Sequence, residues 1–226
     1  MDSEIATNVS DTFLVIDEEV GIFNDAGNLL PISPSSPLRA MTVIPDTTGP
    51  VLHSFDLDLN IGLLILEFTE PVAVLHPSTI TLQSSPTANS TSYTLTGGAL
   101  LSEPSAASLQ VVLTVEDLNN IKALTDLATS VGNTFLSHTL NLTADYALNE
   151  VFPVSSHSAI PTGSIIPDMI APLLIRFSLD MNAAELRLTY EETVDVSSFD
   201  PTRVMLVNSP EDPTSTLTLT TSAVSG

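Results

Sequence analysis

One pair of acidic residues recurs along the chain, and its residue types suit metal binding. Asp46 and Glu70 form the pair, and the same two residue types return 122 positions later. Carboxylate oxygens are hard ligands, and Ca2+ collects six to eight such oxygens. Polar turns precede each pair and add further oxygens where consecutive units of the chain would meet. The candidate calcium ligands are Asp46, Glu70, Asp168 and Glu192, with Asp25, Asn28, Asp145 and Asn149 from the preceding segments.

The same residues have a structural interpretation that stays open beside the calcium hypothesis. Asp and Asn side chains bond to the backbone two residues further on and so shape turns at strand ends. Asp58 and Asn60, which also recur 122 residues later, are typical of such turns.

The residue types needed for catalysis are present but scattered. The four histidines are His53, His76, His138 and His157. His138 follows Ser137 and His157 follows Ser156, but a catalytic triad is defined by spatial roles and not by adjacency. The chain has no cysteine, no glycine-rich phosphate loop and no zinc-ligand spacing. The sequence therefore predicts that this protein is not an enzyme.

An internal repeat must position the acidic pairs. Residues 44–72 and 166–194 share 13 identities in 29 aligned positions without a gap, and Thr12-Phe13-Leu14 recurs as Thr134-Phe135-Leu136. A repeat of about 122 residues predicts three segments. These are the end of a preceding repeat with a linker (1–45), a complete repeat with a linker (46–167), and the start of a following repeat (168–226). We expect the array to continue in a longer parent protein.

Alternating apolar residues predict strands within the complete repeat. Leu64, Leu66 and Phe68 keep their apolar character in the second copy while the residues between them do not, so these three should face the core. Phe55 and Phe177 should be buried at equivalent positions. Further strands are expected near 50–58, 78–83, 91–96, 107–113 and 134–143. Thr114 with Glu116 and Asp117 predicts a helix start, followed by apolar residues at helical spacing as far as Ala128.

These elements predict an all-β protein made of tandem immunoglobulin-like β-sandwich repeats, each with one short helical crossover. The phrase Asp46-Thr47-Thr48-Gly49-Pro50, the phrase Leu66-Glu67-Phe68-Thr69-Glu70-Pro71-Val72, and the closing Asp25-Ala26-Gly27-Asn28 resemble the bacterial-type Ig-like repeats of S-layer and large cell-surface proteins. The resemblance covers the two ends of each repeat. It implies a structural role outside the cell.

Charge and composition narrow the partners. Twenty-seven acidic residues face five basic ones, and the net charge is −22. Such a surface cannot neutralise phosphates, so nucleic acid and anionic membranes are excluded as electrostatic partners. The longest apolar run, residues 61–66, is far shorter than the roughly 20 residues that span a bilayer. The N-terminus is acidic and no apolar stretch of the kind found in signal peptides follows it.

Two further features fit an extracellular array. Asn8, Asn89 and Asn141 begin Asn-x-Ser/Thr sequons and are possible glycosylation sites. The proline-rich segments before Asp46 and Asp168 are expected to be linkers, and Val43, Ile44, Ile165 and Ile166 could pair with the sheet edge of a neighbouring unit.

The sequence thus predicts a structural repeat module of a long extracellular fibre, filament or cell-surface protein, whose partners are neighbouring repeats or copies of itself. The alternative is a calcium-dependent adhesive or glycan-binding module. The low aromatic content of 5% and the absence of tryptophan count against glycan binding.

Overall fold

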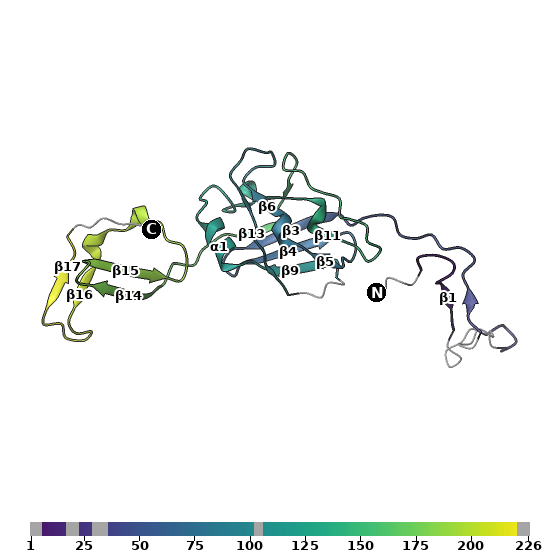
Figure 1. The fold of residues 1–226 in the computed structure, drawn as a ribbon, viewed down its shortest axis with the longest axis horizontal. Coiled ribbons are helices and arrows are strands. Elements are labelled where there is room, and N and C mark those ends of the chain that lie inside the picture. The colour runs from purple at the N-terminus through teal and green to yellow at the C-terminus, as the bar shows by residue number, and fades with distance from the viewer. Residues whose placement is uncertain (1–5, 17–22, 29–35, 102–105, 221–226) are drawn as a thin grey trace.

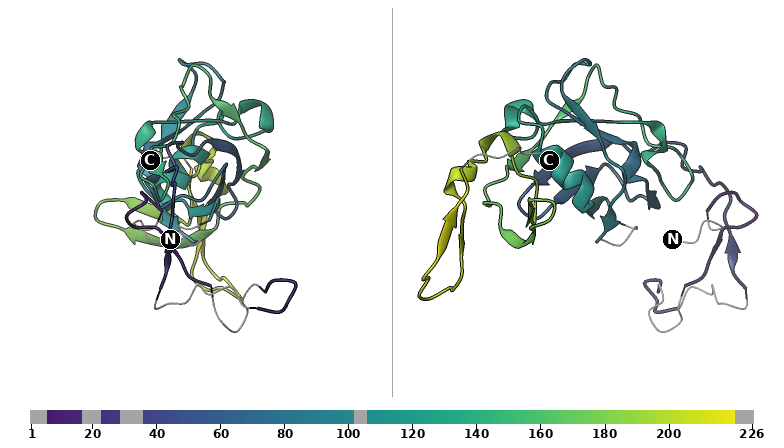
Figure 2. Two further views of the ribbon diagram at one scale, coloured as in Figure 1. Left: turned by 90° about the vertical axis from the view of Figure 1, so that its right-hand side faces the viewer. Right: turned by 60° about the vertical axis from the view of Figure 1, so that its left-hand side comes forward.

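The computed structural model describes residues 6–16, 23–28, 36–101 and 106–220. Figure 1 shows a central part built of two packed sheets, with an N-terminal segment at one end and two C-terminal hairpins at the other. The right-hand view in Figure 2 also shows the N-terminal segment and the C-terminal hairpins on opposite sides of the central part. Strands dominate and α1 (Val115–Lys122) is the only α-helix of the described residues, which confirms the all-β class.

The central part contains a five-stranded and a four-stranded sheet. The larger sheet has the order β13-β3-β4-β9-β8, with bounds Ser164–Ile166, Leu52–Asp58, Leu63–Phe68, Ser108–Val112 and Ala99–Leu100. The smaller sheet has the order β12-β10-β6-β7, with bounds Ile160–Pro161, Phe135–His138, Ile80–Gln83 and Ser92–Thr94. A short pair, β5 (Val74–Leu75) with β11 (Thr143–Ala144), lies at the end nearer the N-terminal segment.

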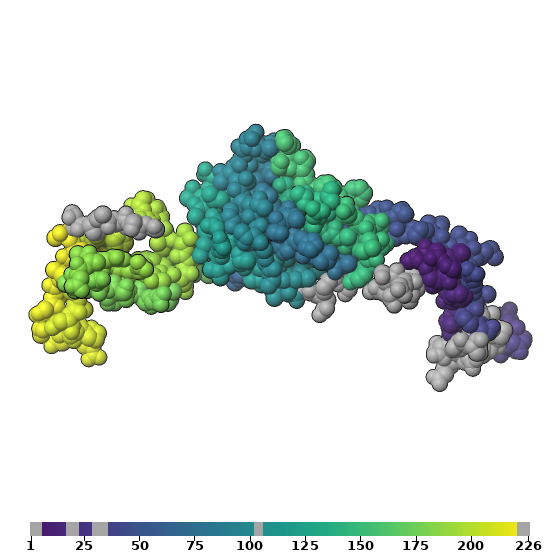
Figure 3. Space-filling model, in the orientation of Figure 1, coloured from purple at the N-terminus to yellow at the C-terminus, as the bar shows by residue number. Residues whose placement is uncertain are grey.

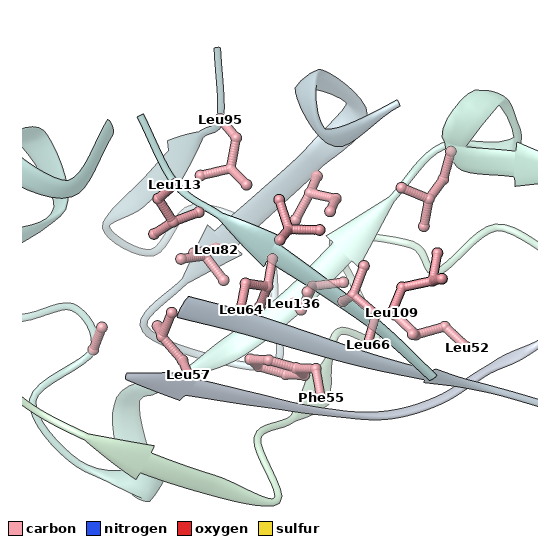
Figure 4. Close-up of a cluster of buried hydrophobic side chains, with 14 of the residues drawn as sticks. Leu52, Phe55, Leu57, Leu64, Leu66, Leu82, Leu95, Leu109, Leu113 and Leu136 are labelled. Carbon is pink, nitrogen blue, oxygen red and sulfur yellow. The ribbon is translucent and has the colours of Figure 1, made fainter. Parts of the chain in front are cut away.

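Leucines from both sheets fill one core between them, as Figure 4 shows. Leu64, Leu66 and Phe68 of β4 are buried, and the residues between them are partly exposed, which confirms the predicted faces of this strand. Leu82 of β6 and Leu136 of β10 meet them from the other sheet. A core of this kind holds the two sheets together through the burial of apolar surface.

Helix α1 begins where the sequence predicts and ends earlier. The Thr114 side chain accepts a hydrogen bond from the Asp117 backbone N–H at 3.0 Å, which caps the first turn. The last helical residue is Lys122, whereas the apolar spacing predicted helix as far as Ala128. Ala128 has a positive φ of 56°, and Leu124 and Leu127 form turns instead. Both Leu127 and Ala128 are nevertheless buried in the core.

Smaller elements complete the chain. The N-terminal segment holds β1 (Phe13–Leu14) paired with β2 (Leu38–Arg39). The C-terminal hairpins are β14 (Leu174–Asp180) with β15 (Glu185–Tyr190), and β16 (Met205–Val207) with β17 (Thr216–Thr218). Single 3₁₀ turns occur at Pro77–Thr79, Val131–Asn133, Leu140–Leu142, Val196–Ser198 and Pro201–Arg203.

The strand pairing recurs at the spacing of the sequence repeat. Phe55 pairs with Leu66 in β3 and β4, and Phe177 pairs with Leu188 in β14 and β15. The register also shifts at the same place in both hairpins, after Leu52 and after Leu174. β1 with β2 likewise repeats β10 with β12, 122 residues earlier. The same local sequence therefore forms the same local pairing along the chain.

The segment 150–167 is not an extended linker. β12 pairs with β10, and β13 pairs in parallel with β3, so that Ile165 lies opposite Leu57 of its own unit. The expectation that Ile165 and Ile166 pair with a neighbouring unit is therefore wrong. β13 pairs instead with the edge of β3 in the same unit. The chain approaches this edge at Gly163, whose backbone N–H donates to the Phe55 carbonyl at 2.8 Å. Val43 and Ile44 lie outside the strands.

The hairpin β3–β4 and its repeat, β14–β15, differ in how far their apolar side chains are buried. Phe55 is fully buried, whereas Phe177 is 59% exposed, so the expected burial of Phe177 is wrong for this chain. No second sheet lies over β14 and β15 in the described residues, and the hairpins form a separate lobe in the space-filling view of Figure 3.

Replacing Phe55 with alanine tests the central core. Phe55→Ala should lower the free energy of unfolding by about 3–5 kcal/mol, because it leaves a cavity between the two sheets. Phe177→Ala removes the same side chain from an exposed site and should cost less than about 1 kcal/mol. Urea unfolding of both variants measures the difference, and equal losses would contradict the assignment of the core.

Candidate functional site

Three carboxylates meet at the end of the central part that is nearer the N-terminal segment. Asp46 precedes β3, Glu70 follows β4 and Asp145 follows β11. One ligand oxygen of each lies within 4.8 Å of the others. Asp46 is exposed, Glu70 is partly buried and Asp145 is buried. We call these three residues the acidic cluster.

The backbone brings the acidic cluster together through long-range contacts. The Thr69 N–H donates to the Val51 carbonyl at 2.9 Å, which extends the β3–β4 pairing up to Glu70. β11 pairs with β5, so Asp145 emerges beside the segment that follows Glu70. Gly49 packs so closely on the Glu150 backbone that a Cβ atom would lie 1.9 Å from the carbonyl oxygen. Only glycine permits this approach, and it holds the Asp46 segment against the turn that begins at Asp145.

Asn149 orients Asp145 and is not a member of the acidic cluster. Its backbone N–H donates to Oδ1 of Asp145 at 2.8 Å, and its side-chain amide donates to Oδ2 at 2.8 Å. The same turn forms at Asn24, whose Oδ1 accepts from the Asn28 N–H at 2.9 Å. The residue that corresponds to Asp145 is therefore Asn24 and not Asp25.

Burial and neighbouring negative charge both act on the Glu70 carboxyl. Burial first, and then the neighbouring charges of Asp46 and Asp145, raise the pKa of the Glu70 carboxyl. Like charges at this distance disfavour a second ionisation. A cation placed among the three carboxylates would remove the repulsion, and the three could hold a metal ion. The donor set of carboxylate oxygens fits a hard divalent cation such as Ca2+.

The equivalent acidic pair at the other end of the central part already contacts a cation. Nζ of Lys122 lies 2.5 Å from Oε2 of Glu192 and 3.1 Å from Oδ1 of Asp168. The side chains of Lys122 and Glu192 are only 8% and 10% exposed, and that of Asp168 is 31% exposed. Breaking a buried ion pair by removing one partner leaves an uncompensated charge, which costs about 3–5 kcal/mol.

Helix α1 carries Lys122 to this position. Asp117 fixes the helix, because its Oδ1 accepts from the Tyr93 hydroxyl and the Thr96 N–H, both at 2.9 Å. Burial raises the pKa of the Asp117 carboxyl, but these hydrogen bonds outweigh it and the pKa is lowered overall. Lys122 lies in the last helical turn, where the helix dipole favours a positive charge.

The ion pair also shifts the titration of the lysine. Burial lowers the pKa of the Lys122 ammonium, but hydrogen bonds to Glu192 and Asp168 outweigh burial, and the pKa is raised overall. The neighbouring backbone is tied down as well, because Oδ1 of Asn60 accepts from the Met169 N–H at 2.9 Å. The chain leaving the central part is therefore held at two points close to Asp168.

The predicted calcium ligands lie in other groups than the calcium hypothesis expects. Asp145 joins Asp46 and Glu70 of its own unit, whereas Asp25 was predicted to meet them and is not in this group of carboxylates. A contribution from Asn28 stays a prediction. Asp168 and Glu192 meet Lys122, and not Asp145 or Asn149. The turn interpretation also holds in part. Oδ1 of Asp46 accepts from the Thr48 N–H, as Asp168 does from Ile170.

Lys122, which contacts the second acidic pair, is not among the residues predicted from the sequence. It is the single lysine of a chain with net charge −22. A lone cation within a predicted helix, in so acidic a chain, is the signal that could have identified it.

The remaining candidates lie elsewhere on the surface. Asn8, Asn89 and Asn141 are all exposed, as attachment of a glycan requires. Ser137 donates its hydroxyl hydrogen bond to Gln83 Oε1 at 3.0 Å, and Nδ1 of His138 contacts the Thr139 carbonyl at 3.0 Å. These contacts do not join Ser137 to His138. Burial lowers the pKa of the His138 imidazole, so the ring is neutral near pH 7.

A carbodiimide cross-link tests the contact of Lys122. This reagent joins an amine directly to a carboxylate within contact distance, and the chain has no other lysine. We expect Lys122 to become linked to Glu192 or Asp168, as identified by mass spectrometry of the digested protein. Lys122→Gln should abolish the link, whereas Arg187→Gln, which removes an exposed ion pair with Glu185, should leave it unchanged. A link from Lys122 to carboxylates elsewhere would contradict the geometry.

Comparisons with known proteins leave the function to be argued from this geometry. The chain matches no protein-family model, no curated protein and no solved structure. Within the described residues, no helix is both long and apolar enough to cross a bilayer.

Proposed function

We propose that this protein is a structural repeat module of a long extracellular fibre, filament or cell-surface protein. In this proposal, tandem immunoglobulin-like units follow one another head to tail. The observation that carries it is the recurrence of one strand pairing, with the same register shift, at the spacing of the sequence repeat. Repeat proteins of this kind are stabilised by contacts between neighbouring units.

The exposed face of the C-terminal hairpins supports an array. Phe177 and Leu179 are 59% and 43% exposed, although their counterparts Phe55 and Leu57 are buried. Two-stranded hairpins are marginally stable in water without a covering layer. We infer that further strands, from flanking sequence or from a second copy, cover this face in the assembled protein.

The charge of the protein fits an extracellular fibre. A net charge of −22 keeps crowded units soluble and apart. At physiological salt, screening acts over about 8 Å, so that charges at a shared junction still interact. A cation at each junction therefore stabilises the array, and the acidic cluster and Lys122 lie where such junctions would form.

The cation at a junction is either a lysine ammonium or a calcium ion. The three carboxylates of the acidic cluster favour calcium as a candidate. A calcium-dependent adhesive role is the corresponding alternative function.

Self-association tests the exposed face. We expect sedimentation velocity to show association that grows with protein concentration, because association would bury the exposed apolar surface of Phe177 and its neighbours. Phe177→Ser should weaken association at least several-fold. Ile170→Ser removes a comparably exposed residue outside β14 and β15 and should have little effect. A monodisperse, stable monomer at all concentrations would count against the fibre proposal.

Thermal unfolding of Glu70→Gln tests the acidic cluster. The raised pKa means that the folded state holds the Glu70 proton to higher pH than the unfolded state does, so stability falls as pH rises through the folded pKa. At pH 7 in chelator, Glu70→Gln should therefore raise Tm, by about 1–3 °C. Glu150→Gln is the exposed control with the same change in charge.

Thermal unfolding in the presence of calcium tests whether the acidic cluster binds this ion. If calcium binds, a concentration 100-fold above Kd should stabilise the wild-type chain by about 2.7 kcal/mol and Glu70→Gln by less. Coincident wild-type curves in calcium and in chelator, at matched ionic strength, would remove calcium from the proposal.

A further inference from the structure

The two acidic sites of the chain are the same site in successive units, seen in two different settings. Asp46 and Glu70 correspond to Asp168 and Glu192 at the spacing of 122 residues. Each Asp forms the same turn with the residue two positions on, and each Glu follows the second strand of the same hairpin. Among the described residues, a cationic group from the preceding unit contacts the second site, and that group is the Lys122 ammonium.

We propose that the acidic cluster is the receptor for the ammonium group of a lysine from the preceding repeat, placed as Lys122 is placed before Asp168 and Glu192. This inference rests on the proposed head-to-tail array. It names the ligand of the acidic cluster as a lysine side chain, in place of a metal ion.

The topology gives every unit one donor end and one receptor end. Helix α1 lies at the end of the central part next to the C-terminal hairpins, and β11 lies at the opposite end (Figure 1). Lys122 therefore leaves each unit towards the next one, and Asp46, Glu70 and Asp145 face the previous one. The same contact can repeat at every junction, as a heterologous head-to-tail interface requires.

The chemistry of the cluster suits an ammonium group. Lysine carries three N–H donors and no acceptor, and three carboxylates converge on one point in the cluster. The Asp168 and Glu192 pair shows that two of these positions accept the ammonium of a lysine whose side chain is only 8% exposed. Asp145 adds a third acceptor, so the complete receptor should hold the lysine at least as firmly. Burial first, and then repulsion from Asp46 and Asp145, raise the pKa of Glu70, and an ammonium would neutralise the charges that cause this repulsion.

A chain with one duplicated unit tests the receptor directly. A second copy of residues 46–167 is inserted between Pro167 and Asp168, which keeps the sequence Ile-Pro-Asp at both junctions. Lys122 of the first copy then precedes a complete acidic cluster in the second copy. Carbodiimide cross-linking of the folded protein is followed by digestion and mass spectrometry.

We expect a link between Lys122 and Glu70, Asp46 or Asp145 that the native chain does not form, because within one unit these residues lie at opposite ends. Lys122→Gln in the first copy alone should abolish this link and spare the link to Glu192. The same substitution in the second copy alone should do the reverse.

Three outcomes would overturn the inference, and they separate it from the proposed function. A folded second copy whose only lysine link is to Glu192 or Asp168 refutes the lysine receptor and leaves the array intact. A link that forms in chelator but disappears in millimolar calcium at matched ionic strength identifies the cluster as a metal site. A second copy that fails to fold, judged by an unchanged far-ultraviolet circular dichroism amplitude per molecule, refutes the tandem array and the inference with it.

Discussion

The ion pair of Lys122 with Asp168 and Glu192 sets the relation between the central part and the hairpins that follow it. A lysine side chain that is only 8% exposed must have its charge compensated. The two carboxylates that do so, Asp168 and Glu192, both lie far from Lys122 in the sequence. The pair therefore joins the end of α1 to two separate segments of the C-terminal part. Thr114 caps the first turn of α1, and Asp117 accepts from the Tyr93 hydroxyl of β7, so the position of the ammonium depends on how the helix is joined to the smaller sheet.

The need to compensate charge applies to the acidic cluster as well. Its carboxylates are held by long-range pairing, by the close approach at Gly49 and by the amide of Asn149, and none of these contacts supplies a positive charge. The fold thus concentrates negative charge at one end of the unit and a single lysine at the other. In the proposed array, the lysine of one unit would contact the carboxylates of the next, so that units associate in one orientation.

The sequence was sufficient to predict the local elements but not their long-range partners. Alternation placed Leu64 and Leu66 in the core, and Thr114 marked the start of α1, because both signals act within a few residues. The partners of Asp145 could not be read from the chain, because they depend on β11 pairing with β5, about 70 residues away. The prolines of segment 150–167 favour a linker, although Ile160 and Ile165 of this segment lie in strands that complete the two sheets. The contact of Lys122 could not be predicted, because an isolated cation belongs to no motif.

The central claim is that successive units are joined end to end by a lysine of one unit and the acidic residues of the next. Electron cryo-microscopy of the intact protein at side-chain resolution tests it most directly. The account predicts a single file of similar units, with side-chain density from each α1 helix entering the carboxylate cluster of the following unit. Units packed side by side, or junctions in which that lysine points into solvent, would contradict it.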